Sequence, residues 1–196
     1  YTLAVQCKLD LRSKTMLITC YLVPLLFFVF MGSIFSAVNP QAKDTLIASM
    51  TVLGVSMGAL IGLPPTLTEM YGGECKKIYL ANGMPLFFGA IVMCLSALIH
   101  LCVMSALLFV AAPLLFDAAL PQNFAQYCLG LLVFIVVSLS VGCVLGLSCH
   151  QQAKLTMLSQ VIFLPSILLS GILFPAELLP RPLKWLAQLF PATWGN

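Results

Sequence analysis

Charged residues are spaced so unevenly along this chain of 196 residues that they divide it into long uncharged windows. The windows cover residues 15–42, 45–68, 78–116, 118–153 and 155–176. A helix that crosses the hydrocarbon core of a bilayer needs about 20 predominantly apolar residues. Each window has room for one such helix, so the pattern predicts five membrane spans.

The composition agrees with a chain surrounded mainly by lipid. Hydrophobic residues make up 61% of the sequence and charged residues only 8%, whereas soluble domains carry about 25% charged residues. The net charge of +3 is small, and its residues gather in a few loops, which argues against a nucleic-acid-binding face. The predicted fold class is therefore an all-α, polytopic membrane helix bundle.

Turn-forming residues set the ends of the predicted spans. Asn82, Gly83 and Pro85 shorten the third window, and a segment rich in Pro, Gln and Asn at residues 120–126 shortens the fourth. The third stretch is too short for the about 40 residues that two crossings need, so one long, tilted or protruding helix is expected. The predicted spans are residues 16–38, 46–63, 86–116, 127–148 and 155–174.

The basic residues favour a cytoplasmic N-terminus. Short cytoplasmic loops carry an excess of Lys and Arg, and this orientation places six of them inside and three outside. The inner set is Lys8, Arg12, Lys14, Lys76, Lys77 and Lys154, and the outer set is Lys43, Arg181 and Lys184. Residues 1–14 mix apolar and charged side chains and are expected to lie on the cytoplasmic surface before the first span.

No pattern of a catalytic or metal site emerges. Five of the eight cysteines lie inside apolar runs (Cys20, Cys94, Cys102, Cys128 and Cys143) and no CxxC pair occurs, so packing roles are favoured. The stretch from Gly146 to His150 lacks the final glycine of a GxSxG elbow. Spacing typical of a metal site is also absent. We predict no enzyme activity, no metal and no cofactor bound by this chain.

Two ionisable residues lie within the third predicted span or at its end. His100 lies near its middle and Asp117 at its outer end, and intramembrane groups of this kind can serve a proton path. A neutral histidine that hydrogen-bonds a neighbouring helix is the favoured interpretation. A secondary transporter or channel subunit that uses His100 stays open as the alternative function, although no pair of interrupted half-helices is evident.

Small residues recur at intervals of four in two spans. Their absence of bulk lets another helix backbone approach closely. Contact within one bundle is favoured, and a subunit contact or a pore-lining face stays open. The residues are Gly54, Gly58 and Gly62 in the second span and Ser138, Gly142 and Gly146 in the fourth.

Two polar segments interrupt the apolar pattern. In residues 64–85, Thr68 is predicted to cap a short cytoplasmic helix with Glu69 in its first turn, with a solvated connector as the alternative. Residues 175–191 carry Glu177, Arg181 and Lys184, too many charges for a span. Apolar residues at helical spacing and Trp185 predict a short interfacial or re-entrant helix there.

In the order of these features, over nearly its whole length, the chain resembles the type 2 permeases of ABC transporters. The most specific resemblance is to a family signature at the outer gate. This signature consists of Leu-Ser-Gly, a large apolar residue and several prolines. It comprises Leu169, Ser170, Gly171, Phe174, Pro175, Pro180 and Pro191. The second match is residues 69–83, which look like the coupling-helix segment, although Thr68 and Met70 stand where arginines commonly flank the glutamate.

The resemblance implies a half-transporter core of six spans, of which this chain shows five, with the C-terminal span missing. It would pair with a second permease, as a homo- or heterodimer, and with ATPase subunits that bind ATP and Mg²⁺. Its expected role is to export a drug, antibiotic, peptide, lipid or polysaccharide across a bacterial cell membrane. The implied contacts with the ATPase are Glu69, Met70, Tyr71, Glu74, Lys76, Lys77, Tyr79 and Leu80.

Overall fold

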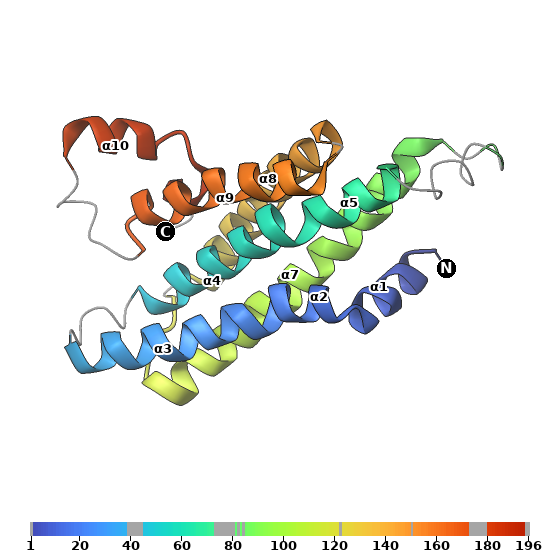
Figure 1. The fold of residues 1–196 in the computed structure, drawn as a ribbon. Coiled ribbons are helices and arrows are strands. Elements are labelled where there is room, and N and C mark those ends of the chain that lie inside the picture. Colours follow the sequence, from blue (N-terminus) through green and yellow to red (C-terminus); the bar gives the residue numbers. More distant parts are fainter. Residues whose placement is uncertain are drawn as a thin grey trace.

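The computed structural model describes residues 2–38, 45–72, 81, 83, 85–121, 123–149, 151–172 and 180–194. Throughout these residues the regular structure is helical, and the long helices lie roughly antiparallel in one bundle (Figure 1). Four helices are long and apolar enough to cross a membrane, and a shorter apolar helix covers Ile18–Ile34. The four are Leu46–Tyr71, Phe87–Phe116, Phe124–Ser148 and Gln152–Leu169. The predicted all-α membrane helix bundle is thus confirmed. In the described residues, four candidate spans and one shorter apolar helix take the place of the five predicted spans.

The first part of the chain forms a short helix and then a long one. Helix α1 covers Thr2–Arg12 and packs against α7. Helix α2 (Lys14–Leu17), the π-helical turn η1 (Ile18–Leu22) and α3 (Val23–Val38) follow one another without a break. The predicted first span, 16–38, therefore lies within one helical rod.

The second rod lies at the centre of the bundle. It consists of α4 (Leu46–Met57), the π-helical turn η3 (Gly58–Gly62) and α5 (Leu63–Gly72). In its most apolar window 78% of the residues are buried, against 22–39% in the other three candidate spans. Among the described residues, this rod therefore supplies more buried hydrophobic side chains to the core than any other helix.

The second rod corrects one boundary of the sequence prediction. The span was expected to end at Leu63, and a new helix was expected to begin at Thr68. Instead the helix continues through Pro64 and Pro65 to Gly72, which places Thr68 in its interior. Prolines break helices because they lack an N–H and clash with the preceding turn. The wider π-helical turn just ahead, closed by Leu63 N–H to Gly58 O, relieves that clash.

Helices α7 and α8 form an antiparallel pair. Helix α7 covers Leu86–Phe116, as predicted, and its 31 residues are about 46 Å long, longer than a hydrocarbon core of about 30 Å. It ends at Asp117, which adopts the left-handed conformation at φ 51°. Helix α8 covers Phe124–Ser148, three residues more than predicted at its start, because the Asn123 side chain accepts a hydrogen bond from Gln126 N.

The last helices lie at one side of the bundle. Helix α9 covers Gln152–Leu169 and ends where Gly171 adopts φ 84°. Two short helices, α10 (Arg181–Ala187) and α11 (Pro191–Trp194), follow. Helix α10 lies within residues 175–191, where a short helix is predicted. Residues 173–179 lie outside the described residues.

Glycines allow close helix packing around the central rod. A Cβ added to Gly58 would lie 2.5 Å from Leu101 Cδ2, and one added to Gly62 would lie 3.2 Å from Cys20 Sγ. On α8, an added Cβ at Gly142 would strike the backbone oxygen of Ala59. The small residues of both spans thus face neighbouring helices of the same bundle.

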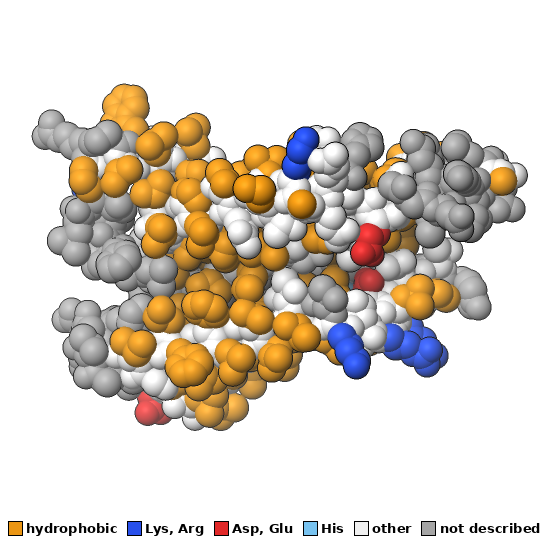
Figure 2. Space-filling view, viewed as in Figure 1, with side chains coloured by type: hydrophobic (Ala, Val, Ile, Leu, Met, Phe, Trp, Pro, Cys, Tyr) orange, Lys and Arg blue, Asp and Glu red, His pale blue; other side chains and the backbone are white. Residues whose placement is uncertain are grey.

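The surface separates lipid-like and water-like regions. Figure 2 shows hydrophobic side chains over most of the flank of the bundle, while charged side chains gather mainly toward the end at which α1 lies. We call this the α1 end, and the opposite one, where α10 lies, the α10 end (Figure 1). Among the described residues, the exposed charged ones of the α1 end are Lys8, Arg12, Lys14, Glu69 and Lys154.

Candidate functional site

Helix α1, the last turns of α5 and α8 and the first turns of α7 and α9 meet at the α1 end (Figure 1). This arrangement follows from the antiparallel course of the long helices. It brings together polar residues that are far apart in the sequence. The candidate functional site is therefore this end of the bundle.

Three of the predicted coupling residues lie in the last turns of α5. Glu69 is exposed, and no described residue forms an ion pair with its carboxylate. Met70 is buried, and the Tyr71 hydroxyl accepts a hydrogen bond from Ala90 N of α7 at 3.2 Å. The other predicted coupling residues, Glu74, Lys76, Lys77, Tyr79 and Leu80, lie outside the described residues.

Thr68 connects α5 to the end of α8. Its Oγ1 lies 2.9 Å from Gly146 O and 3.3 Å from Cys149 O, besides 3.1 Å from Pro64 O in its own helix. The last carbonyl groups of a helix have no partner inside that helix and need one elsewhere. Thr68 therefore donates its single hydroxyl hydrogen toward carbonyl oxygens at and just beyond the end of α8, with Gly146 O the nearest, and does not cap a helix.

A small cavity with a mixed polar and apolar lining opens between these elements. Its volume is about 190 Å³, and it lies between the α1–α2 junction, η1, η3, α5 and α9. Glu69 is the charged residue of its lining. The polar lining residues are Ser13, Thr19, Thr66, Glu69 and Gln152.

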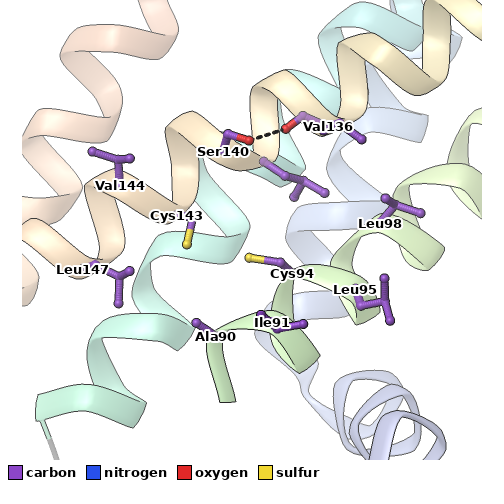
Figure 3. A pocket seen from close by; sticks show the side chains of 11 residues that line it. Ala90, Ile91, Cys94, Leu95, Leu98, Val136, Ser140, Cys143, Val144 and Leu147 are labelled. Carbon is purple, nitrogen blue, oxygen red and sulfur yellow. Dashed lines mark hydrogen bonds between the residues drawn. The ribbon is translucent and has the colours of Figure 1, made fainter. Parts of the chain in front are cut away.

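A larger cavity between α7 and α8 is almost entirely apolar. Its volume is about 440 Å³, and Ala90, Leu98 and Val144 are among its lining residues. Figure 3 shows the side chains of Cys94 and Cys143 pointing toward one another across it. Both cysteines are free thiols. The two cavities thus differ in polarity, and different helices line them.

A polar cluster that is buried on α7 and partly buried on α1 and η1 joins these three elements. We define it as Asp10, Tyr21, Ser96 and His100. Ser96 Oγ donates to Asp10 Oδ2 at 2.5 Å, and the Tyr21 hydroxyl lies 2.8 Å from His100 Nδ1. His100 Nε2 lies 4.0 Å from Asp10 Oδ2 and has no hydrogen-bond partner. The predicted hydrogen bond of His100 to a neighbouring helix is confirmed, with Tyr21 as the partner.

Sequence reasoning missed Asp10 as a member of this cluster. A signal was present in the spacing: Ser96 and His100 are four residues apart on α7, and so are Gln6 and Asp10 on α1, so each pair shares one helix face. Gln6 Nε2 indeed donates to Asp10 Oδ1 at 2.9 Å. What the sequence did not reveal is that these two faces meet.

The predicted outer signature lies at the α10 end. Leu169 ends α9, Ser170 Oγ donates to Ile167 O at 2.8 Å, and Gly171 allows the turn that follows. Pro180 precedes α10, and Pro191 begins α11 and lines a groove of about 500 Å³ along α8. Phe174 and Pro175 lie outside the described residues. The two predicted sets of site residues are thus at opposite ends of the bundle.

Metal ligands do not cluster in the described part of the chain. No group of three or more His, Cys, Asp or Glu side chains there is arranged to hold a metal ion. The chemistry that the described polar residues offer is hydrogen bonding and proton binding.

Comparison with known families gives one match. A family model described as "ABC-2 type transporter" matches residues 2–196. The match includes the central rod, the polar cluster and the segments at both ends of the bundle. No curated protein and no solved structure matches this chain significantly.

Proposed function

This chain belongs to the ABC-2 type transporter family and forms a transmembrane permease domain of an ABC transporter, and we propose that it works as an exporter. Permeases of this family typically have no catalytic activity of their own. ATP and Mg²⁺ would therefore be bound by a partner ATPase. The cargo would be a drug, antibiotic, peptide, lipid or polysaccharide, and a second permease, identical or different, would complete the path.

The proposed route of coupling is the segment 69–80. The observation that carries it is the way in which the end of α5 is bonded to its neighbours. Thr68 is bonded to the end of α8, and Tyr71 is bonded to the start of α7. A displacement of Glu69 by the ATPase would therefore move three long helices together. The exposed carboxylate of Glu69, which forms no ion pair with any described residue, supports a contact with a basic residue of the partner.

The proposed orientation places the α1 end in the cytoplasm of a bacterial cell. Four exposed basic residues lie there, namely Lys8, Arg12, Lys14 and Lys154. At the α10 end, Lys184 is an exposed basic residue among the described ones. Cytoplasmic loops carry the excess of Lys and Arg, so this distribution supports a cytoplasmic N-terminus, with α10 and α11 at the outer face.

The test is a double charge reversal, Glu69→Lys with Lys76→Glu. It should reduce transport by the reconstituted complex at least about tenfold and abolish the stimulation of ATP hydrolysis by substrate, because a charge pair at an interface becomes a repulsion. Insertion into the membrane should be unchanged. Lys184→Glu, which reverses an exposed charge on α10, is the matched control. Normal coupling in the double variant would refute the assignment of segment 69–80.

A second pair of variants tests the connection through Thr68. Thr68→Val removes the hydroxyl that bonds α8, whereas Thr66→Val removes one that bonds only Leu63 O in its own helix. Thr68→Val should lower transport per ATP hydrolysed several-fold, and Thr66→Val should not. If both variants transported the same amount of substrate per ATP hydrolysed, Thr68 would be excluded from the coupling route.

A further inference from the structure

We infer that His100 and Asp10 form a proton-binding site that controls the docking of α1 on α7. The site belongs to the chain itself and does not depend on the direction of transport or on the cargo. Its parts are a partly buried carboxylate on α1 and a buried imidazole on α7. Their separation, 4.0 Å between Asp10 Oδ2 and His100 Nε2, places an ion pair within reach of a small movement.

The first argument is the environment of Asp10. Its side chain is only 14% exposed, and its hydrogen-bond donors are the neutral groups of Ser96 and Gln6. A carboxylate removed from water is costly unless a positive charge compensates it. The nearest group in the described residues that can become positive is His100. A proton on His100 therefore compensates the buried charge of Asp10.

The second argument is the unused nitrogen of His100. The residue is 4% exposed, and Nε2 has no hydrogen-bond partner although it faces Asp10. Buried polar atoms nearly always have a partner, and an exception calls for an explanation. In the imidazolium form both ring nitrogens are donors. Nε2–H then points to a carboxylate, which is the strongest kind of acceptor for it.

The third argument is that Tyr21 fits both protonation states. Its hydroxyl lies 2.8 Å from His100 Nδ1 and 3.4 Å from His100 O. With a neutral ring, the O–H donates to Nδ1. With an imidazolium, Nδ1–H donates to the hydroxyl oxygen, and the O–H rotates to the carbonyl oxygen of the same residue. No other side chain needs to move when the proton binds.

Other titratable groups do not obscure the effect. Cys7 of α1 and Cys20 and Tyr21 of η1 lie around the cluster, and thiols and phenols are ordinarily neutral below pH 8. The central rod carries no ionisable side chain between residues 46 and 68. Lys8, Arg12 and Lys14 are exposed to solvent. Histidine is the side chain that ordinarily changes its charge between pH 5 and 8.

The direction of the effect follows from linkage. If the proton binds about tenfold more tightly when Asp10 is in place, then the protonated state holds α1 about tenfold more tightly. Docking is therefore strongest at acidic pH and weakens as the pH rises and His100 loses its proton. Because α1 leads directly into α2 and η1, its release frees the start of the first helical rod.

The direct test uses the fact that the chain has only two histidines. The variant His150→Gln leaves His100 as the sole histidine, and ¹⁵N NMR of labelled protein in lipid nanodiscs then follows its ring. His100 should titrate between pH 5 and 8, and Asp10→Asn should lower its proton affinity about tenfold. Asp117→Asn, on the same chain but at the α10 end, should change nothing. No titration in this range, or an unchanged affinity in Asp10→Asn, would overturn the proposal.

A second measurement keeps the test valid if Asp10→Asn disturbs folding. Hydrogen exchange of the amides in residues 2–12, corrected for the intrinsic effect of pH, should show about tenfold greater protection at pH 5.5 than at pH 8. His100→Gln keeps a hydrogen-bonding side chain but cannot become charged, so the pH difference should vanish. A wild-type protein with equal corrected protection at both pH values would contradict the proposal.

Discussion

The two ends of the bundle are joined by different kinds of contact. At the α1 end the elements are connected by side-chain hydrogen bonds, namely Tyr21 with His100, Ser96 with Asp10, Thr68 with Gly146 and Tyr71 with Ala90. The described residues of the α10 end also form such a bond, between Tyr127 and Thr51, but this end is joined mainly by aromatic rings that pack edge to face or tilted, with centroids 5.3–5.7 Å apart. The aromatic pairs are Phe28–Phe116, Phe109–Phe124 and Phe109–Tyr127.

This difference affects how each end responds to a signal. Hydrogen bonds are directional, and those of the α1 end include the carboxylate of Asp10 and the imidazole of His100, so charge or a partner protein changes them. Aromatic packing depends on shape and is insensitive to pH. The α1 end is therefore suited to receive an input, and the α10 end is suited to keep α3, α7 and α8 together while it does so.

The largest expected effect comes from filling the close contact between α8 and the central rod. Two glycines of α8 form a matched pair for this test. Gly142→Leu forces a side chain against the backbone of Ala59, whereas Gly130→Leu points into open space. The first variant should lose at least about 3 kcal/mol of stability, because backbone cannot move aside as a flexible side chain can. Thermal unfolding in detergent measures the difference.

Gly130→Leu should unfold within a few degrees of the wild type. This control has the same size change on the same helix, but at an exposed position. If both variants were equally destabilised, close backbone approach would not be specific to the half of α8 near the α1 end.

The next effect concerns the aromatic packing of the α10 end. Phe28 is 1% exposed and packs against Phe116 with ring centroids 5.3 Å apart, whereas Phe30 on the same helix is 66% exposed. Phe28→Ala should cost about 3 kcal/mol through lost contacts and a cavity. Phe30→Ala should stay within about 0.5 kcal/mol of the wild type. The loss in Phe28→Ala should be the same at pH 5.5 and pH 8, and a loss that changed with pH would contradict the contrast between the two ends.

Much of the helical arrangement was predictable because the sequence marks it locally. Charges and turn residues bound the 86–116 helix on both sides, and that prediction matches α7 at both ends. Asn123 was a cap visible in the sequence, yet its helix was predicted to start three residues late. Local signals thus predict the existence of a helix more reliably than they predict its first residue.

The misses arise where tertiary structure or helix geometry overrides a local signal. Pro64 and Pro65 indicate a break, but a π-helical turn ahead of them lets the central rod continue to Gly72. The contacts of the polar cluster join residues 79 and 86 positions apart. A single sequence does not show which helix faces meet, so the role of Asp10 became visible only in the structure.

The smallest expected effect is a difference in how the stability of two tyrosine variants, one at each end of the bundle, depends on pH. Tyr21→Phe removes a hydroxyl that lies 2.8 Å from His100 Nδ1, and Tyr127→Phe removes one that lies 3.1 Å from Thr51 Oγ1. At pH 8 each variant should lose about 1 kcal/mol, the ordinary net value of one hydrogen bond.

At pH 5.5 the two variants should differ. A protonated His100 in Tyr21→Phe keeps a buried N–H without an acceptor, and hydrogen bonds to charged groups contribute about 1.5–3 kcal/mol, so its loss should grow to about 2 kcal/mol. Tyr127→Phe should remain near 1 kcal/mol, because Thr51 has no charge to gain. Unfolding by denaturant at the two pH values measures both losses. A loss that grew equally in Tyr127→Phe would show that the response to pH belongs to the whole bundle, and the distinct role of the α1 end would have to be abandoned.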